Sequence, residues 1–218
     1  MNAPLIELRG VHFAYDPARV VLDNLDLAIA PGERLGMTGS NGSGKTTLLH
    51  LIVGLVRPTA GEVICFGAPR RTEAEFVDVR RRAGLLFQDS DDQLFCPTVG
   101  EDVAFGPLNL GVTRSDAERR TRAALDAVGL HGYEDRITYK LSGGEQRLVA
   151  LATVLAMEPD VLLLDEPLTG LDEEHETRVI SILDSLPQAM LIVSHDRQFL
   201  DRIATRHATL SRGQISSA

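Results

Sequence analysis

The stretch Gly39-Ser40-Asn41-Gly42-Ser43-Gly44-Lys45-Thr46 decides the fold. It fits the phosphate-loop pattern G-x-x-x-x-G-K-[ST], with an apolar strand expected before it at Arg34–Thr38 and a helix after it at Lys45–Val53. Glycines let the backbone curl until successive N–H groups face one centre, and the start of a helix adds a positive dipole end. The pattern therefore predicts a site for the phosphates of a nucleotide.

The pattern also assigns roles within this loop. Lys45 is expected to bridge the β- and γ-phosphates, and the hydroxyl of Thr46 to ligate Mg²⁺. The expected nucleotide-binding residues here are Gly39, Ser40, Asn41, Gly42, Ser43, Gly44, Lys45, Thr46 and Thr47. A chance glycine loop is the alternative, and the flanking strand and helix argue against it.

A second part of the site is predicted at Val161-Leu162-Leu163-Leu164-Asp165-Glu166, an apolar run that ends in two carboxylates. Ligands bind at the carboxyl ends of the strands in open α/β sheets. We expect Asp165 to hold Mg²⁺ through water, and Glu166 to polarise or deprotonate the attacking water. The alternative is a strand that ends in a solvated acidic turn.

Periodicity predicts an α/β fold with a mostly parallel central sheet. The expected strands are Ile6–Tyr15, Leu25–Ile29, Arg34–Thr38, Glu62–Phe66, Ala83–Phe87, Val161–Leu164, Met190–Ser194 and Ala208–Ser211. The expected helices are Lys45–Val53, Arg114–Val128, Glu145–Met157, Glu174–Leu186 and Arg197–Ala204. We expect one domain, 1–218, with a core at about 1–90 and 155–218 and a helical subdomain inserted at about 91–154.

Composition narrows the class of protein. The 218 residues are 44% apolar and carry a net charge of −9, which suits a globular protein and argues against binding to nucleic acid. Cys65 and Cys96 lack the spacing of a metal or redox pair, so both are expected to be reduced thiols. No apolar run approaches the ~20 residues of a membrane span, so a membrane role is expected to come through a partner.

A second glycine motif, Leu141-Ser142-Gly143-Gly144-Glu145-Gln146-Arg147, resembles the LSGGQ signature of ATP-binding-cassette ATPases. Two glycines at a helix start expose backbone N–H groups and form a second anion site. An ordinary helix cap by Ser142 is compatible with this reading but does not explain the double glycine. Glu145 replaces the usual glutamine, and Leu168 stands where relatives have Thr or Ser.

The resemblance covers nearly the whole chain and implies further roles. Tyr15 matches the residue that stacks on adenine, and Gln88 matches the glutamine that contacts Mg²⁺ and the attacking water. Asp172 matches the aspartate that communicates across the dimer, and His195 the histidine near the γ-phosphate. The family pattern makes Glu166, His195, Gln88 and Lys45 the expected catalytic residues, and Ser142, Gly143 and Gly144 part of the nucleotide site.

The same resemblance implies the architecture and the reaction. The expected fold is a P-loop NTPase core with an N-terminal antiparallel β region and an inserted helical subdomain. The expected activity is ATP hydrolysis with Mg²⁺. The expected assembly is a head-to-tail dimer of two copies, in which each ATP lies between the P-loop of one copy and the signature of the other. A regulatory protein that binds ATP without hydrolysing it is one alternative.

The segment Phe87–Phe95 with Pro97–Pro107 is similar to ATPases of energy-coupling-factor transporters. In that family it lines the groove for the coupling helices of a transmembrane subunit. The expected apolar anchors are Leu94, Phe95, Val99 and Phe105, and the expected charged partners are Asp91, Asp92, Glu101 and Asp102. The alternative is that these apolar residues merely pack the helical subdomain, as Val103 and Phe105 are expected to do.

The run Tyr139–Pro159 looks most like the ATPases of cobalt and nickel importers. The resemblance implies a peripheral protein at the cytoplasmic face of the membrane, bound to a transmembrane coupling subunit and a substrate-binding membrane subunit. Two alternatives stay open. One is the ATPase of a vitamin importer, for example for biotin. The other is a soluble cassette ATPase that acts on nucleic acid or ribosomes.

Overall fold

The computed structural model describes residues 3–16 and 18–217 and divides the chain into two compact units. The first unit comprises Met1–Leu85, Asp160–Asp165 and Pro187–Ala218. The second unit comprises Leu86–Pro159 and Glu166–Leu186. The boundary between Asp165 and Glu166 therefore separates the two carboxylates of the sequence motif, which remain covalent neighbours.

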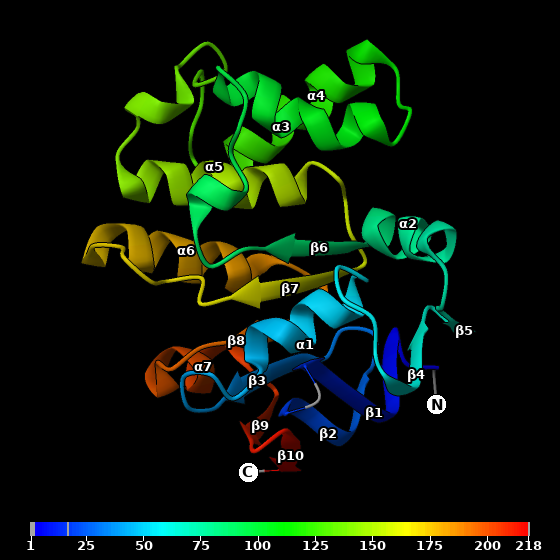
Figure 1. The fold of residues 1–218 in the computed structure, drawn as a ribbon. Helices are drawn as coiled ribbons and strands as arrows, with labels where there is room; N and C mark the ends of the chain where they lie inside the picture. Colours follow the sequence, from blue (N-terminus) through cyan, green and yellow to red (C-terminus); the bar gives the residue numbers. More distant parts are fainter. Residues whose placement is uncertain (1–2, 17, 218) are drawn as a thin grey trace. The chain divides into compact units, whose positions relative to one another are not determined.

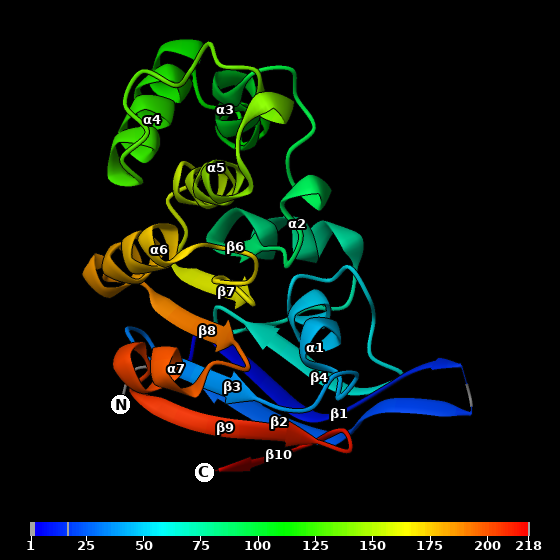
Figure 2. The ribbon, with the colours of Figure 1, turned by 90° about the vertical axis from the view of Figure 1, so that its left-hand side faces the viewer.

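An antiparallel sheet in the first unit has the strand order β2-β1-β4-β5. Its strands are β1 (Ile6–Asp16), β2 (Arg19–Ile29), β4 (Ala60–Cys65) and β5 (Ala68–Pro69). Figure 2 shows β1 and β2 as a long hairpin. The prediction that the second strand begins at Leu25 was wrong. Its first half pairs with the end of β1, where Asp16 lies opposite Arg19, so pairing rather than apolar alternation extends it.

A second sheet in the same unit has the strand order β10-β9-β3-β8-β7-β6 (Figure 1). Its strands are β3 (Arg34–Thr38), β6 (Ala83–Leu86), β7 (Val161–Asp165), β8 (Ala189–Val193), β9 (Arg206–Ser211) and β10 (Gln214–Ser217). The ladders β3–β8, β3–β9 and β7–β8 are parallel, and β9–β10 is antiparallel. Every residue of β7 and β8 is buried, as expected for strands covered on both faces.

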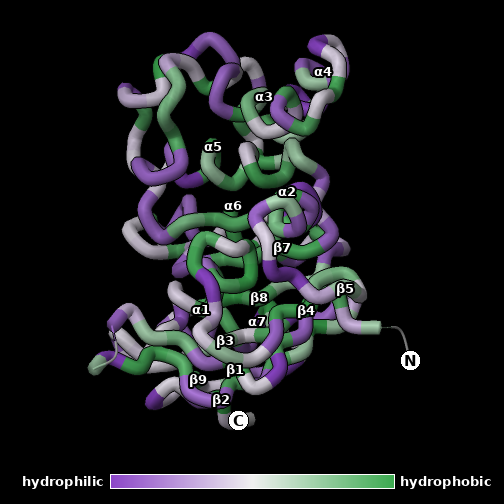
Figure 3. Tube along the Cα trace, turned by 45° about the vertical axis from the view of Figure 1, so that its right-hand side comes forward, coloured by the Kyte–Doolittle hydropathy of each residue, from purple (hydrophilic) through white to green (hydrophobic). Residues whose placement is uncertain are grey.

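The core of the first unit joins both sheets to the helix that follows the phosphate loop. Its buried apolar side chains come from β1, β3, β7 and β8 and from α1 (Lys45–Ile52), and Phe76 of α2 (Glu73–Arg82) packs among them. Strongly hydrophobic segments of the tube coincide with β7 and β8 in Figure 3. A third helix, α7 (Arg197–Ile203), follows β8. Burial of this apolar surface is the main stabilising term of the unit.

The second unit is helical. It contains α3 (Val99–Asn109), α4 (Arg114–Ala127), α5 (Gly143–Leu155) and α6 (Glu173–Ser185), together with short 3₁₀ turns at Ser90–Asp92 and Thr138–Lys140. Helices α3, α4 and α5 pack against one another around fully buried side chains such as Val103, Leu125 and Leu148. The predicted fold class is confirmed: a mostly parallel central sheet, an antiparallel N-terminal sheet and a set of helices.

Helix α2 was not predicted, and α3 was expected only as part of the helical subdomain, without bounds of its own. Both begin with a reciprocal capping box, in which the hydroxyl of Thr72 or Thr98 accepts from the N–H of Glu75 or Glu101, and the glutamate accepts from the threonine N–H. The arginine-rich α2 lacks a strong apolar stripe, and α3 contains Gly and Pro, so periodicity missed them. The T-x-x-E spacing is the local signal that indicates their starts.

No helix within residues 3–16 and 18–217 combines the length and the apolar character that crossing a bilayer requires.

Replacing Leu163 by alanine tests the role of β7 in the core. Leu163 is fully buried opposite Leu191 of β8, so Leu163→Ala should lower the free energy of unfolding by about 2–5 kcal/mol. Leu55→Ala is the control because Leu55 is 52% exposed, and its effect should stay within about 0.5 kcal/mol. Chemical denaturation followed by circular dichroism measures both. Equal shifts in the two variants would contradict a core role for β7.

Candidate nucleotide site

A lysine folds back over the loop between β3 and α1. Lys45 is the first residue of α1 and is 9% exposed. Its Nζ donates to the carbonyl oxygen of Gly39 at 2.8 Å and to that of Ser40 at 3.2 Å. A buried ammonium is costly unless acceptors or negative charge surround it. The loop therefore holds a positive charge where an anion of the size of a phosphate group would neutralise it.

Two glycines of the loop are required by close contacts. Gly44 has φ +104°, and a Cβ there would lie 2.9 Å from Cγ1 of Val21. At Gly39 a Cβ would lie 2.4 Å from the carbonyl oxygen of Leu210. Side chains at these positions would push the loop away from β2 and β9, so glycine maintains the tight curl.

The polar groups of the loop fit a phosphate. No side chain caps the N-terminus of α1 at Gly44, so its first N–H groups remain available to a ligand. The hydroxyl oxygen of Ser43 is buried and has no hydrogen-bond partner among the described residues. Buried polar groups are normally paired, and a phosphate oxygen would supply the missing partner.

The parallel register aligns three further segments with the loop. Met37 of β3 lies opposite Val193 of β8, and Val193 lies opposite Asp165 of β7. Because neighbouring strands are about 4.8 Å apart, the loop after β3 and the carboxylate of Asp165 share one edge of the sheet. Asp165 is 3% exposed. His195 is exposed two residues beyond β8, in a turn fixed by the N–H of Ser194 donating to the carbonyl of Met37 at 3.2 Å.

An exposed aromatic ring stands beside α1. Tyr15, at the end of β1, is 56% exposed, and its ring meets that of Phe13 edge to face at a centroid distance of 4.9 Å. Its hydroxyl lies 3.0 Å from Oγ1 of Thr47, the third residue of α1. The ring is thus held at its hydroxyl end and is more than half exposed, which suits stacking on a nucleobase.

In the second unit, the signature motif begins α5. Ser142 caps the helix, and the carboxylate of Glu145 accepts from the N–H of Ser142 at 2.9 Å. The hydroxyl of Tyr133 donates to the other oxygen of Glu145 at 2.8 Å. These bonds lower the pKa of Glu145, and the bond from the N–H of Ser142 is the largest cause. The hydrogen bond between Tyr133 and Glu145 raises the pKa of Tyr133. Glu145 thus acts as the reciprocal residue of a capping box.

The double glycine of the signature has two different surroundings. A Cβ on Gly143 would meet nothing within 4 Å, so this backbone is open. A Cβ on Gly144 would lie 2.6 Å from the ring of His175, so this position excludes a larger residue. His175 in turn donates its N–H to Asp172, the cap of α6, at 2.9 Å, and this bond is the main cause of the lowered pKa of Asp172. His175 therefore connects the signature to the loop of Asp172.

Gln88 and Glu166 also belong to the second unit. Gln88 is exposed two residues beyond β6. Glu166 follows β7 directly, is half-buried and has φ +45°. This left-handed backbone costs a non-glycine residue on the order of 1 kcal/mol or more and persists only where its surroundings hold it. An outlier of this kind at a predicted catalytic residue marks a constrained position.

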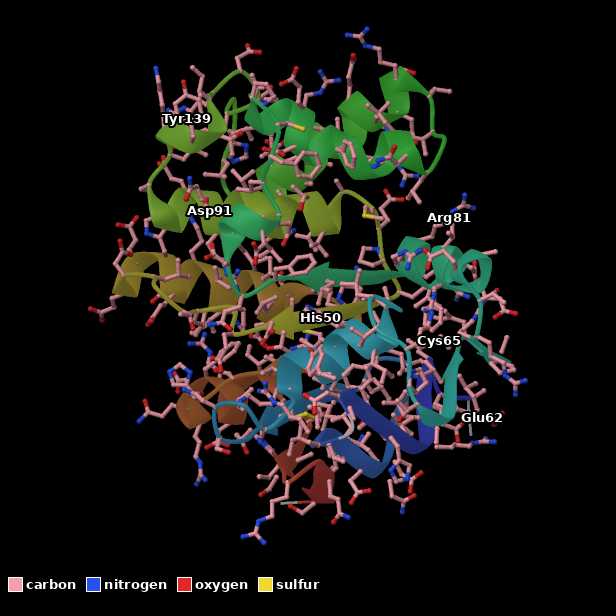
Figure 4. The ribbon with its side chains drawn as sticks, in the orientation of Figure 1. His50, Glu62, Cys65, Arg81, Asp91 and Tyr139 are labelled. Atoms are coloured by element: carbon pink, nitrogen blue, oxygen red, sulfur yellow. The ribbon has the colours of Figure 1, made fainter. Side chains whose placement is uncertain are left out.

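The segment after Gln88 exposes an aromatic pair. Phe95 is 64% exposed and Phe105 is 46% exposed, and their rings meet edge to face at a centroid distance of 4.8 Å. Two predicted charged partners, Asp91 and Asp92, are exposed nearby in the chain, and Figure 4 labels Asp91 on its short turn. The expectation that Phe105 packs inside the helical subdomain was wrong, because its ring is 46% exposed. Val103 is fully buried and does pack there.

Two residues predicted to face a partner are inside the unit instead. Val99 is fully buried at the start of α3. Asp102 is 3% exposed, and its carboxylate accepts from the N–H of Phe95 at 3.0 Å and from Oγ1 of Thr138 at 3.0 Å. The predictions for Val99 and Asp102 were wrong, because the capped first turn of α3 rotates both toward the interior.

The structure therefore distributes the predicted site residues between its units. Tyr15, the loop from Gly39 to Thr47, Asp165 and His195 belong to the first unit. Gln88, Ser142, Gly143, Gly144, Glu166 and Asp172 belong to the second. Each group contains one glycine-rich helix start, so each unit presents one potential anion site.

Comparison with known proteins identifies the family. The sequence model of the family described as ABC transporter matches residues 22–169, more than half of the chain. The chain belongs to the ABC transporter family. ABC transporter ATP-binding subunits hydrolyse ATP, so the protein is an ATPase and ATP is its substrate. The resemblance drawn from the motifs is confirmed.

Relatives place this ABC ATPase within the family. It is 52% identical to an ABC transporter ATP-binding protein of Brucella suis, over 99% of this chain and 89% of the relative. It is 41% identical to the energy-coupling factor transporter ATP-binding protein EcfA of Methanothermobacter thermautotrophicus, over 97% of this chain and 69% of the relative. The protein is therefore an ABC ATPase of the energy-coupling-factor type.

Solved structures agree with the fold of this ABC ATPase. CbiO1 of Clostridium perfringens, part of the ABC transporter complex CbiONQ, matches with a TM-score of 0.88 and 29% identity, over 99% of this chain and 88% of that chain. A dimeric ATP-binding cassette in a post-hydrolysis state with ADP and Pi matches with a TM-score of 0.88 and 26% identity, over 97% and 98%.

Sequence reasoning missed three residues of the ABC signature region. Arg147 is 2% exposed on α5 and donates to four main-chain carbonyls, Tyr133 holds Glu145, and His175 packs on Gly144. Arg147 carries a signal in the sequence, because an arginine among the apolar residues of a helix needs buried partners. Tyr133 and His175 carry none, because their contacts arise from tertiary packing.

The lowered pKa of Glu145 predicts a pH dependence of stability. A carboxylate whose pKa is lower in the folded state stabilises the fold fully above its ordinary pKa, 4.5, and loses that contribution as pH falls through the lowered value. Glu145→Gln keeps the capping geometry without the titration. Between about pH 6 and pH 3 the wild type should therefore lose more unfolding free energy than this variant.

Glu174→Gln is the matched control, because Glu174 is an exposed carboxylate on α6 of the same unit. Denaturation midpoints measured across this pH range give the comparison. The interpretation fails if the wild type and Glu145→Gln follow the same curve.

Proposed function

We propose that this ATPase powers the uptake of a transition metal ion, cobalt or nickel, through membrane partners of an energy-coupling-factor importer. The observation that carries the membrane coupling is the exposed pair Phe95–Phe105, in the segment that follows Gln88. Solvent-exposed aromatic pairs flanked by charged residues are typical of the centres of protein interfaces. The likeness to CbiO1, a component of CbiONQ, supports cobalt or nickel as the cargo.

Within each copy, the residues take the roles that their positions allow. Lys45 and the N–H groups of the loop bind the β- and γ-phosphates, and Tyr15 stacks on the adenine. His195 stabilises the γ-phosphate from the same sheet edge. Gln88 orients the attacking water, and Glu166 accepts its proton. Catalysis is positioning and electrostatic stabilisation, with no covalent intermediate on the protein.

The predicted ligands suit Mg²⁺. Thr46, Gln88 and Asp165 offer a hydroxyl, an amide and a carboxylate oxygen, and Mg²⁺ prefers a few such oxygens together with phosphate oxygens and water. Bound Mg²⁺ neutralises charge that develops on the phosphates during hydrolysis. The residues of the chain fix where the triphosphate lies.

Two copies are proposed to share two ATP molecules. The P-loop of one copy and Ser142, Gly143 and Gly144 of the other would contact the same triphosphate. The open backbone at Gly143 supports this arrangement, and so does the dimeric cassette with ADP and Pi to which the chain is similar. Asp172, linked to Gly144 through His175, would carry information between the two sites. Hydrolysis removes the γ-phosphate that completes both anion sites, so the dimer reopens.

Replacing Glu166 tests the catalytic assignment. Glu166→Gln should reduce phosphate release by about 100-fold or more, because the amide cannot accept the proton of the attacking water. The variant should still bind Mg-ATP and accumulate as a dimer in size-exclusion chromatography. Glu173→Gln, an exposed carboxylate on α6, should keep wild-type turnover. Unchanged hydrolysis by Glu166→Gln would remove Glu166 from this role.

Co-purification with metal uptake tests the transport assignment. The protein should bring a transmembrane coupling subunit and a substrate-binding membrane subunit out of detergent-solubilised membranes. Cells carrying Lys45→Ala should lose cobalt or nickel uptake, because the phosphate site loses its buried cation. Phe95→Asp should weaken co-purification without changing ATP affinity. Leu55→Asp, an exposed position of the first unit, is the control.

The other outcomes separate the alternatives. A vitamin importer would be favoured if the membrane complex is recovered and cells carrying Lys45→Ala keep metal uptake but lose biotin uptake. Absence of any membrane subunit, together with hydrolysis stimulated by nucleic acid or ribosomes, would favour a soluble cassette ATPase.

A further inference from the structure

Arg147 lies in the interior of the second unit although it carries a full charge. It is the fifth residue of α5, the helix that the signature motif begins, and only 2% of its surface is exposed. Arginine is almost never this buried unless its guanidinium is fully engaged. Its neighbours therefore indicate what the charge is used for.

The guanidinium donates to two separate stretches of main chain. Nη1 donates to the carbonyl oxygen of Phe87 and, at 3.2 Å, to that of Gln88. Nη2 donates to the carbonyl oxygen of Glu166 at 2.9 Å, and Nε to that of Pro167 at 3.0 Å. The planar group has five N–H donors in a fixed fork, so one rigid unit holds both stretches at once.

Both stretches contain a residue proposed to act on the attacking water. Arg147 reaches both residues through the main chain, because the carbonyl oxygens of Gln88 and Glu166 accept these bonds. Glu166 also has the left-handed backbone with φ +45°, which needs external restraint to persist. The bonds from Arg147 to the carbonyl oxygens of Glu166 and Pro167 supply that restraint.

A second contact fixes the same end of β6 to α5. The side-chain oxygen of Gln93 accepts from the N–H of Phe87 at 3.2 Å, and its amide nitrogen donates to the carbonyl of Ala150 at 2.8 Å. Phe87 is therefore held through its N–H by Gln93 and through its carbonyl by Arg147. Of these two side chains, Arg147 is the one that also bonds to the carbonyl oxygen of Glu166.

We propose that Arg147 is a positioning residue for ATP hydrolysis, which holds the backbones of Gln88 and Glu166 in the spacing and orientation that the reaction needs. This inference rests on the proposed roles of Gln88 and Glu166. Arg147 does not touch the substrate. It acts through the two residues that do, and it ties them to the helix of the signature motif.

Conservative replacement of Arg147 tests the proposal. Lysine keeps the charge, but its single nitrogen cannot span four carbonyls. Arg147→Lys should lower kcat by about 10- to 100-fold, because small misplacements of catalytic groups cost that much. ATP affinity, which depends on the first unit, should stay within about two-fold. The measurements are phosphate release at several ATP concentrations and the equilibrium binding of a fluorescent ATP analogue.

Arg120→Lys is the matched control. Arg120 belongs to the same unit, and its side chain is 18% exposed. Its ion pairs with Asp116 and Glu158 do not involve the stretches of Gln88 and Glu166. It should lower the melting temperature without lowering kcat. A second variant, Arg147→Ala, leaves space for free guanidinium, and millimolar guanidinium should restore part of its turnover while leaving Arg120→Lys unaffected.

Two results would overturn the proposal. One is wild-type kcat in folded Arg147→Lys. The other combines two findings. Arg120→Lys loses as much kcat as Arg147→Lys at the same loss of melting temperature, and guanidinium does not restore the turnover of Arg147→Ala. Glu166→Gln separates this failure from that of the catalytic assignment. If Glu166→Gln is inactive while Arg147→Lys is fully active, only the positioning role of Arg147 is lost.

Discussion

The parallel pairing of β3, β8 and β7 is the constraint on which the first unit depends. Because the three strands run in the same direction and in register, their carboxyl ends bring together the phosphate loop, the turn of His195 and the carboxylate of Asp165. Every residue of β7 and β8 is buried, and apart from Asp165 at the end of β7 their side chains are apolar, so these strands contribute mainly stability and direction. The chemistry lies at the carboxyl ends of these strands and in the segments that follow them.

The same capping box begins the signature helix α5 and two helices outside the signature, α2 and α3. Thr72, Thr98 and Ser142 each begin a helix with a hydroxyl that is answered by a glutamate three residues later. Only the third is followed by two glycines, and there the open backbone at Gly143 and the close approach of His175 to Gly144 depart from an ordinary cap. A functional motif has thus been built on a common local structure, and the glycines rather than the cap mark its specialisation.

The sequence predicted what depends on local pattern and missed what depends on packing across the fold. The loop of Lys45, the apolar run before Asp165 and the glycines of the signature carry their meaning in consecutive residues, so fold class, family and activity followed from them. Inward rotation of Val99 and Asp102 depends on where α3 begins, which periodicity did not reveal. The contacts of Arg147 with Phe87 and Glu166 join residues 60 and 19 positions away. Such distances have no signature in a single sequence.

The choice of acceptors by Arg147 has a consequence for how the family can vary. Every bond described for its guanidinium ends on a main-chain oxygen, and all amino acids possess one. The side chains at positions 87, 88, 166 and 167 can therefore change in evolution without removing a single one of these acceptors. The arrangement is sensitive to the length of the chain instead, because an insertion or deletion beside either carbonyl pair would shift both acceptors away from the fork. Divergent sequences can keep this geometry as long as their spacing is preserved.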